Sequence, residues 1–114
     1  MITRRPDDGR VHVSGSLEEA TTLVVCLAGE LDAATAPDVR EFAELEVAAA
    51  QPGRLVLDVT ELRFVDSSGL ALLLGLRTCV PEGAVVLRGA RRQLLRLLEI
   101  TGADVLLPLE PDAP

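Results

Sequence analysis

Two serines and a glycine follow an aspartate where an apolar, strand-like run gives way to a helix-like run. The segment is FVDSSGLALLLGL, residues 64–76. Asp66 or Ser67 can cap this helix, because a side-chain oxygen of either residue can accept hydrogen bonds from the free amides of the first turn. A cap does not explain Gly69, since glycine inside a helix costs roughly 0.5–1 kcal/mol relative to alanine. We therefore expect that something approaches the backbone closely at Gly69.

The serine hydroxyls at this helix start could also accept a phosphoryl group. The free N–H groups and the positive end of the helix dipole suit an anion. A phosphoserine, which carries about −1.5 to −2 charges at neutral pH, would be tolerated there without unfolding the domain. A partner protein bound over the same spot would meet a desolvated dianion. The segment thus predicts a binding switch that leaves the fold intact.

A serine hydrolase is the alternative from a different functional class. It needs a base within reach of Ser67, and the only histidine in the chain is His12. The sequence around the serines is DSSG, which is not the G-x-S-x-G turn of the α/β-hydrolases. We expect a binding module with no catalytic residues and no enzyme activity.

The two cysteines, Cys26 and Cys79, lie in apolar sequence and show no C-x-x-C spacing. They are predicted to be buried free thiols, because zinc sites draw on closely spaced ligand pairs. We expect no metal site and no cofactor.

Composition limits the remaining classes. The 114 residues, 48% of them hydrophobic, suffice for one domain with one core. The formal net charge of −7 argues against direct nucleic-acid binding, which depends on neutralising phosphates. The local cluster of Arg88, Arg91, Arg92 and Arg96 is predicted to be a solvated helix face. The apolar run 70–74 is too short to cross a bilayer, and no apolar stretch follows the basic N-terminus, so we predict a cytoplasmic protein without membrane insertion.

Strands and helices are predicted to alternate along most of the chain. Strands are expected at 11–16 (a short edge strand), 22–29, 54–59, 84–87 and 105–109, with a connector at 60–65.

Three helices are expected between these strands. One begins at Thr35, with Asp38 in the capping-box position, and stops at Pro52-Gly53. The others cover about 67–80 and 90–101, and Gly102 ends the last. Residues 1–10 are predicted to be a flexible tail, 11–109 the domain and 110–114 a C-terminal tail. This pattern predicts an α/β domain with a mixed, largely parallel sheet.

Three pieces of the chain resemble the anti-sigma factor antagonists, the stand-alone members of the STAS domain family. They are GELDAATAP (29–37), LVLDVTELRFVDSSGLALLLG (55–75) and RGARRQLLRLLEITGADVLLPL (88–109). The resemblance covers residues 23–109, and DSSG between a strand and a helix is its most specific part. Ala71 departs from the family pattern, since many members have a second glycine there. The resemblance implies a sheet of four to five strands with helices on one side.

The resemblance also implies a partner-switching function. The unphosphorylated protein would bind an anti-sigma factor and so free the sigma factor. That anti-sigma factor would be a serine kinase that phosphorylates Ser67, and a PP2C-type phosphatase would remove the phosphate. Ser68 is not the expected acceptor, because its hydroxyl lies deeper in the first turn, where it can bond the backbone.

Contact with the kinase is implied for Asp32, in GELD, and for Asp66, Ser67, Ser68 and Gly69. We expect Asp32 to matter for this contact and little for folding. A second function within the same family is a subunit of a lipid-transport or stress-signalling complex in which Ser67 is never phosphorylated.

Overall fold

The structure is a computed structural model that describes residues 2–5 and 10–111. Its elements are β1 (Ile2–Arg5), β2 (Val11–Glu18), β3 (Thr22–Leu31), α1 (Ala36–Ala50), β4 (Arg54–Val65), α2 (Ser67–Gly75), the 3₁₀ turn η1 (Leu76–Cys79), β5 (Val85–Arg88), α3 (Arg92–Thr101) and the 3₁₀ turn η2 (Ala103–Val105).

The strands form one mixed sheet in the order β1-β2-β3-β4-β5. β1, β2 and β3 pair antiparallel, whereas β3, β4 and β5 pair parallel. Each parallel pair is joined by a helical crossover, α1 or α2, because parallel neighbours cannot be linked by a tight turn. The predicted α/β fold with a mixed sheet is confirmed.

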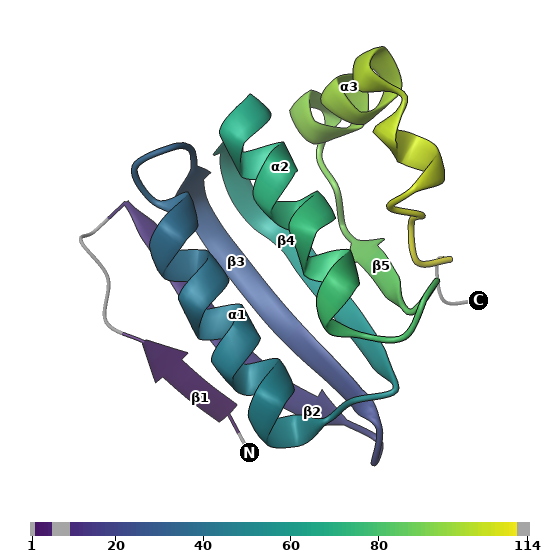
Figure 1. Ribbon diagram of the computed structural model, residues 1–114. Helices are drawn as coiled ribbons and strands as arrows, with labels where there is room; N and C mark the ends of the chain where they lie inside the picture. Colours follow the sequence, from purple (N-terminus) through teal and green to yellow (C-terminus); the bar gives the residue numbers. More distant parts are fainter. Residues whose placement is uncertain (1, 6–9, 112–114) are drawn as a thin grey trace.

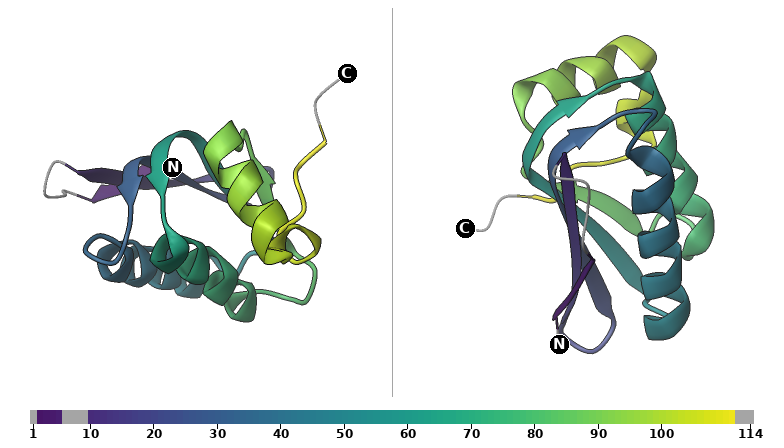
Figure 2. Two further views of the ribbon diagram at one scale, coloured as in Figure 1. Left: turned by 90° about the horizontal axis from the view of Figure 1, so that it is seen from above. Right: turned by 90° about the vertical axis from the view of Figure 1, so that its left-hand side faces the viewer.

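Helices α1 and α2 lie side by side over one face of the sheet, as predicted, and α3 lies beyond α2 near the β5 edge (Figures 1 and 2). The core between sheet and helices is aliphatic apart from Phe42. Leu27 and Leu57 from the strands are buried against Val39, Phe42 and Leu73 from the helices. Within the described residues, no helix combines the length and the apolar character that crossing a membrane requires.

The predicted connector at 60–65 is wrong, because β4 runs without a break to Val65. Its inward residues here are Val59, Leu62 and Val65, which are spaced by three instead of two. The cause is two register shifts, at which β4 carries one extra residue opposite β3. A β-bulge of this kind changes the phase of the inward side chains, so a search for strict alternation misses the strand.

Both ends of the chain also differ from prediction. Residues 2–5, expected in a flexible tail, form β1, so β2 is not an edge strand. Residues 1, 6–9 and 112–114 of the predicted tails lie outside the described residues. The backbone pairing of β1 follows from the open edge of β2, not from any pattern in a short polar segment.

The predicted strand 105–109 is also wrong. Residue 105 ends η2, and only Leu109 makes an isolated bridge, to Leu87. Pro108 cannot donate a ladder hydrogen bond, which limits the pairing. Glu110, assigned to the C-terminal tail, is instead bound to Arg88, with 2.7 Å between Nε and Oε1.

Candidate functional site

The segments GELD and DSSG meet at one edge of the sheet. Leu31, the last residue of β3, is in register with Val65, the last residue of β4. Asp32 and Asp66 therefore follow neighbouring positions at the carboxyl ends of two parallel strands (Figure 1). The Asp66 N–H donates to the Leu31 carbonyl over 3.2 Å, which joins the two segments directly.

Of the two predicted cap residues, Asp66 and Ser67, it is Asp66 that caps α2. Its backbone is extended, and its Oδ1 accepts from the Gly69 N–H at 2.9 Å. Ser67 is the first helical residue and is exposed, whereas Ser68 is half-buried. Within the described part of the chain neither hydroxyl makes a hydrogen bond, so the expected backbone bond of Ser68 is not seen. Exposure distinguishes the two serines and favours Ser67 as the accessible hydroxyl.

Gly69 is buried, and the close approach predicted there comes from Leu31 of the same chain. A Cβ at this position would collide with the Leu31 carbonyl oxygen and would lie 2.9 Å from its Cγ. Gly69 thus lets the first turn of α2 pack onto the end of β3. Its role in this geometry is to bring the Ser67 turn and the Asp32 turn together.

Asp32 is the centre of a hydrogen-bonded turn before α1. Its Oδ1 accepts from the backbone N–H of Ala34 at 3.0 Å and of Thr35 at 3.1 Å, and its other oxygen pairs with the Arg10 guanidinium. Arg10 also contacts Glu30 at 3.3 Å. Burial alone would raise the pKa of the Asp32 carboxyl, but the Thr35 and Ala34 amides and Arg10 together lower it.

Thr35 holds the predicted N-cap position of α1, but the side-chain cap expected of it is not formed. The Thr35 hydroxyl makes no cap bond to α1; it donates to the Glu30 carbonyl at 2.9 Å and accepts from the Asp32 N–H at 3.0 Å. Because of these contacts, we expect Asp32 to contribute more to folding than the sequence alone suggested. Sequence reasoning missed Arg10 altogether, since it lies in the predicted flexible tail, 22 residues from Asp32.

We expect Asp32→Ala to lower the melting temperature by a few degrees at pH 7, because two backbone amides and Arg10 lose their acceptor. The folded-state pKa of Asp32 lies below its ordinary value of 3.8, so its contribution is present above that value and is lost as the pH falls further. Melting curves from pH 7 to pH 3 should show the variant and the wild type converging in acid. Glu44→Ala, on an exposed position of α1, is the control. A constant difference at all pH values would contradict the assignment.

A shallow groove separates the first turns of α1 and α2 beside the serines. It has a volume of about 380 Å³ and is lined by Ala33, Ala36, Pro37, Arg40, Ser68, Ala71 and Leu72. Most of its side chains are small, which leaves the two helix starts open to a partner. Ala71, the departure from the family pattern, lies within the groove.

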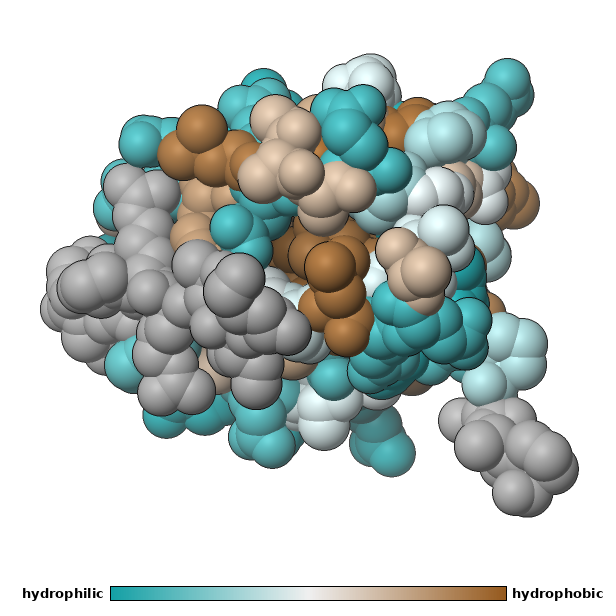
Figure 3. Space-filling model, turned by 90° about the horizontal axis from the view of Figure 1, so that it is seen from below, coloured by the Kyte–Doolittle hydropathy of each residue, from teal (hydrophilic) through white to brown (hydrophobic). Residues whose placement is uncertain are grey.

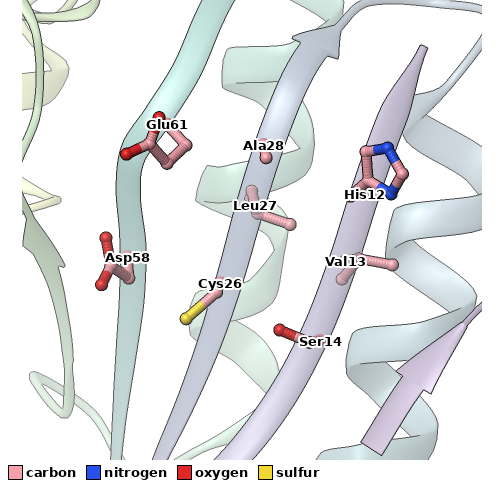
Figure 4. A pocket seen from close by; sticks show the side chains of 8 residues that line it. All are labelled: His12, Val13, Ser14, Cys26, Leu27, Ala28, Asp58 and Glu61. Carbon is pink, nitrogen blue, oxygen red and sulfur yellow. The ribbon is translucent and has the colours of Figure 1, made fainter. Parts of the chain in front are cut away.

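A second pocket lies on the face of the sheet away from the helices (Figure 4). It has a volume of about 240 Å³, and its polar side chains are His12, Ser14, Cys26, Asp58 and Glu61. His12 therefore belongs to the open face, whereas Ser67 begins a helix on the opposite face. This arrangement does not provide the Ser67–His12 pair that the hydrolase alternative needs.

Both cysteines are free, as predicted, but they are half-buried and not buried. Cys26 lies between Ser14 and Asp58 in one row across the sheet. Burial, with the Asp58 carboxylate, raises the pKa of the Cys26 thiol.

Because only the thiolate is nucleophilic, Cys26 should react slowly at pH 7–8 and faster as the pH rises beyond the usual range for a free cysteine. Iodoacetamide labelling of a Cys79→Ser variant, followed by mass spectrometry, measures this rate. The same variant in denaturant is the control. Equal rates in the folded and denatured protein near neutral pH would contradict the prediction.

The end of the molecule remote from Asp32 and Ser67 has a mixed surface (Figure 3). Hydrophobic residues gather near the centre of this face, and hydrophilic residues surround them. The end of α1 and η1 border a hollow at Val47, Gln51–Gly53 and Thr78–Pro81. The aligned ends of β3 and β4 and the exposed Ser67 hydroxyl lie at the opposite end of the molecule. That end is therefore the better candidate for the functional site.

Comparison with known proteins shows which family the chain resembles. A family model described as "Mlab, STAS domain" matches residues 18–108. The chain is 33% identical over 105 residues to the anti-sigma-B factor antagonist of Listeria monocytogenes, covering 88% of this chain and 90% of that one. It is 32% identical to the anti-sigma F factor antagonist of Paenibacillus polymyxa, over 76% of each chain.

A solved structure shows the same fold. The crystal structure of an anti-sigma factor antagonist from Mycobacterium paratuberculosis superposes with a TM-score of 0.81 at 25% identity, and the match covers 95% of this chain and 92% of that one.

Proposed function

The chain belongs to the STAS domain family, and from that premise we propose that it is an anti-sigma factor antagonist controlled by phosphorylation of Ser67. The unphosphorylated form binds an anti-sigma factor with serine kinase activity and so releases a sigma factor. Phosphate on Ser67 ends this binding, and a PP2C-type phosphatase restores it. The protein itself acts by binding in the cytoplasm, and the kinase and the phosphatase that act on it are its enzyme partners.

The observation that carries the proposal is the exposed Ser67 hydroxyl at the start of α2. It lies where the ends of two parallel strands bring the Asp32 turn and the Asp66 cap together. A kinase that reaches Ser67 also covers the groove next to Ser68, so the same surface serves for binding and for modification. We propose that Asp32, Asp66 and Ser68 form that surface, with Gly69 setting its geometry from beneath.

The test is incubation with ATP and the anti-sigma factor kinase that co-purifies with the protein. We expect one added phosphate by intact mass, located on Ser67 by tandem mass spectrometry. Ser67→Ala should remain unmodified, and Ser68→Ala, the matched control, should be modified like the wild type. Phosphate on Ser68 or on a threonine would refute the assignment of the acceptor.

The alternative within the same domain family is a subunit of a larger lipid-transport or stress-signalling assembly. In that case Ser67→Asp should leave the partners that co-purify with the chain unchanged. Under the switch proposal, Ser67→Asp should release the anti-sigma factor from the same preparation.

A further inference from the structure

Among the described residues, the edge of β4 that faces β5 has no strand partner beyond Asp58. β5 pairs with β4 only from Leu55↔Val85 to Asp58↔Arg88 and ends there. β4 continues to Val65, the residue directly before Asp66 and Ser67. The N–H and C=O of one residue in a strand point to the same side. Since the Asp66 N–H is directed at Leu31 of β3, the polar groups of Val65 face the edge that β5 leaves open.

The side chain of Gln93 occupies this open edge. Its Oε1 accepts from the Val65 N–H at 3.0 Å, and its Nε2 donates to the Val65 carbonyl at 3.1 Å. A primary amide offers one acceptor and up to two donors, so it can replace both hydrogen bonds of a missing strand residue. Val65 itself is buried, with 3% of its surface exposed.

The segment before α3 is attached to the same edge. Arg91 Nε donates to the Thr60 carbonyl at 2.7 Å, and its guanidinium lies 3.6 Å from Glu61. Gly89, at φ +74°, allows the backbone to pass close to Thr60. The loop before α3 follows β4 and so places Gln93 next to Val65. The two hydrogen bonds between Gln93 and Val65 are therefore part of a longer contact between this loop and β4.

We propose that Gln93 is a positioning residue that holds the β4–α2 turn and thereby sets the geometry in which Ser67 is presented to its partner. The turn is held from one side by Leu31, which contacts Asp66 and Gly69, and from the other side by Gln93 at Val65. The consequence for partner binding rests on the proposed function, whereas the consequence for the turn does not.

The first experiment measures amide hydrogen exchange in the isolated protein by NMR. Gln93→Leu removes both hydrogen bonds and should accelerate exchange of the Val65 amide and of the following amides through Gly69 by about tenfold or more. Arg92→Leu, an exposed change in the same helical turn without a bond to β4, is the matched control and should leave these amides unchanged. Unchanged protection of Val65 in Gln93→Leu would overturn the proposal.

A second variant covers the case in which Gln93→Leu does not fold. At pH 7, Gln93→Glu keeps an acceptor for the Val65 N–H but cannot donate to its carbonyl. Protonation restores an O–H donor near the ordinary glutamate pKa of about 4.3. At pH 7 the carboxylate and the Val65 carbonyl oxygen repel each other, so protection factors at Val65 should be low and should recover towards pH 4. A variant that is equally protected at both pH values would overturn the proposed role of the amide.

The third measurement connects the turn to the function. With the kinase that co-purifies with the wild type, the rate of Ser67 phosphorylation should fall about five- to tenfold in Gln93→Leu and stay unchanged in Arg92→Leu. Faster exchange with an unchanged phosphorylation rate would overturn the positioning role. If the wild type itself is neither bound nor phosphorylated, the proposed function fails, and the exchange data alone decide the role of Gln93.

Discussion

Phosphorylation of Ser67 is expected to weaken binding to the anti-sigma factor by about 100-fold or more. In the complex the first turn of α2 would lie beneath the partner, out of water. A charge placed there loses its hydration, at an effective cost of several kcal/mol. Since about 1.4 kcal/mol corresponds to a factor of ten in affinity, this cost amounts to two or more orders of magnitude.

The free protein should be affected far less by the same charge. Ser67 is exposed at the helix start, where the dipole favours an anion by up to ~1 kcal/mol. The Asp66 carboxylate already occupies the cap through its bond to Gly69, so part of that gain is offset by repulsion between the two anions. We expect the melting temperature to change little, which makes the modification a switch of binding and not of folding.

Calorimetric titration of four forms against the same partner measures this effect. The forms are wild type, phosphorylated protein, Ser67→Ala and Ser67→Asp, with thermal melts of each alone. Ser67→Ala should bind like the wild type, and Ser67→Asp should bind more weakly but less so than the phosphorylated form, because aspartate carries about half the charge. Affinities of the phosphorylated and unmodified forms within a factor of about three would identify a scaffold instead of a switch.

Gly69→Ala is expected to destabilise the protein by about 1–3 kcal/mol. Helix propensity alone predicts the opposite sign, a gain of up to ~1 kcal/mol for alanine within a helix. The structure reverses that sign because the new Cβ would meet the carbonyl oxygen of Leu31, which belongs to a buried strand and cannot move aside. The collision would separate α2 from β3 and disturb the Asp66 cap and the Ser67 turn.

Gly75→Ala is the matched control on the same helix. There a Cβ would meet only the end of the flexible Arg40 side chain, which can rotate away, so alanine should be neutral or stabilising by up to ~1 kcal/mol. Urea unfolding of both variants measures the two free energies of unfolding. If Gly69→Ala proves as stable as Gly75→Ala, the contact with Leu31 does not limit the approach of α2.

The amino-acid sequence determined those features that depend on residues close together in the chain. Continuous apolar runs marked β3 and the first half of β4, and the 3.6-residue spacing marked α1 and α3, since burial of one face requires that spacing. The cap at its start marked α2. Asp66 was predictable as a cap because the amide it accepts from lies three residues away. The family motif around Ser67 likewise lies within one short segment.

The contacts that shape the site around Asp32 and Ser67 could be found only in the tertiary structure. Asp32 is held by Arg10, Gly69 fits against Leu31, and Gln93 binds Val65 across 28 residues of sequence. The strand β1 and the second half of β4 exist because neighbouring strands offer free edges or bulged registers, not because of a local pattern. Each of these features depends on two segments that are brought together only by the folded sheet, and for that reason neither segment shows it when read by itself.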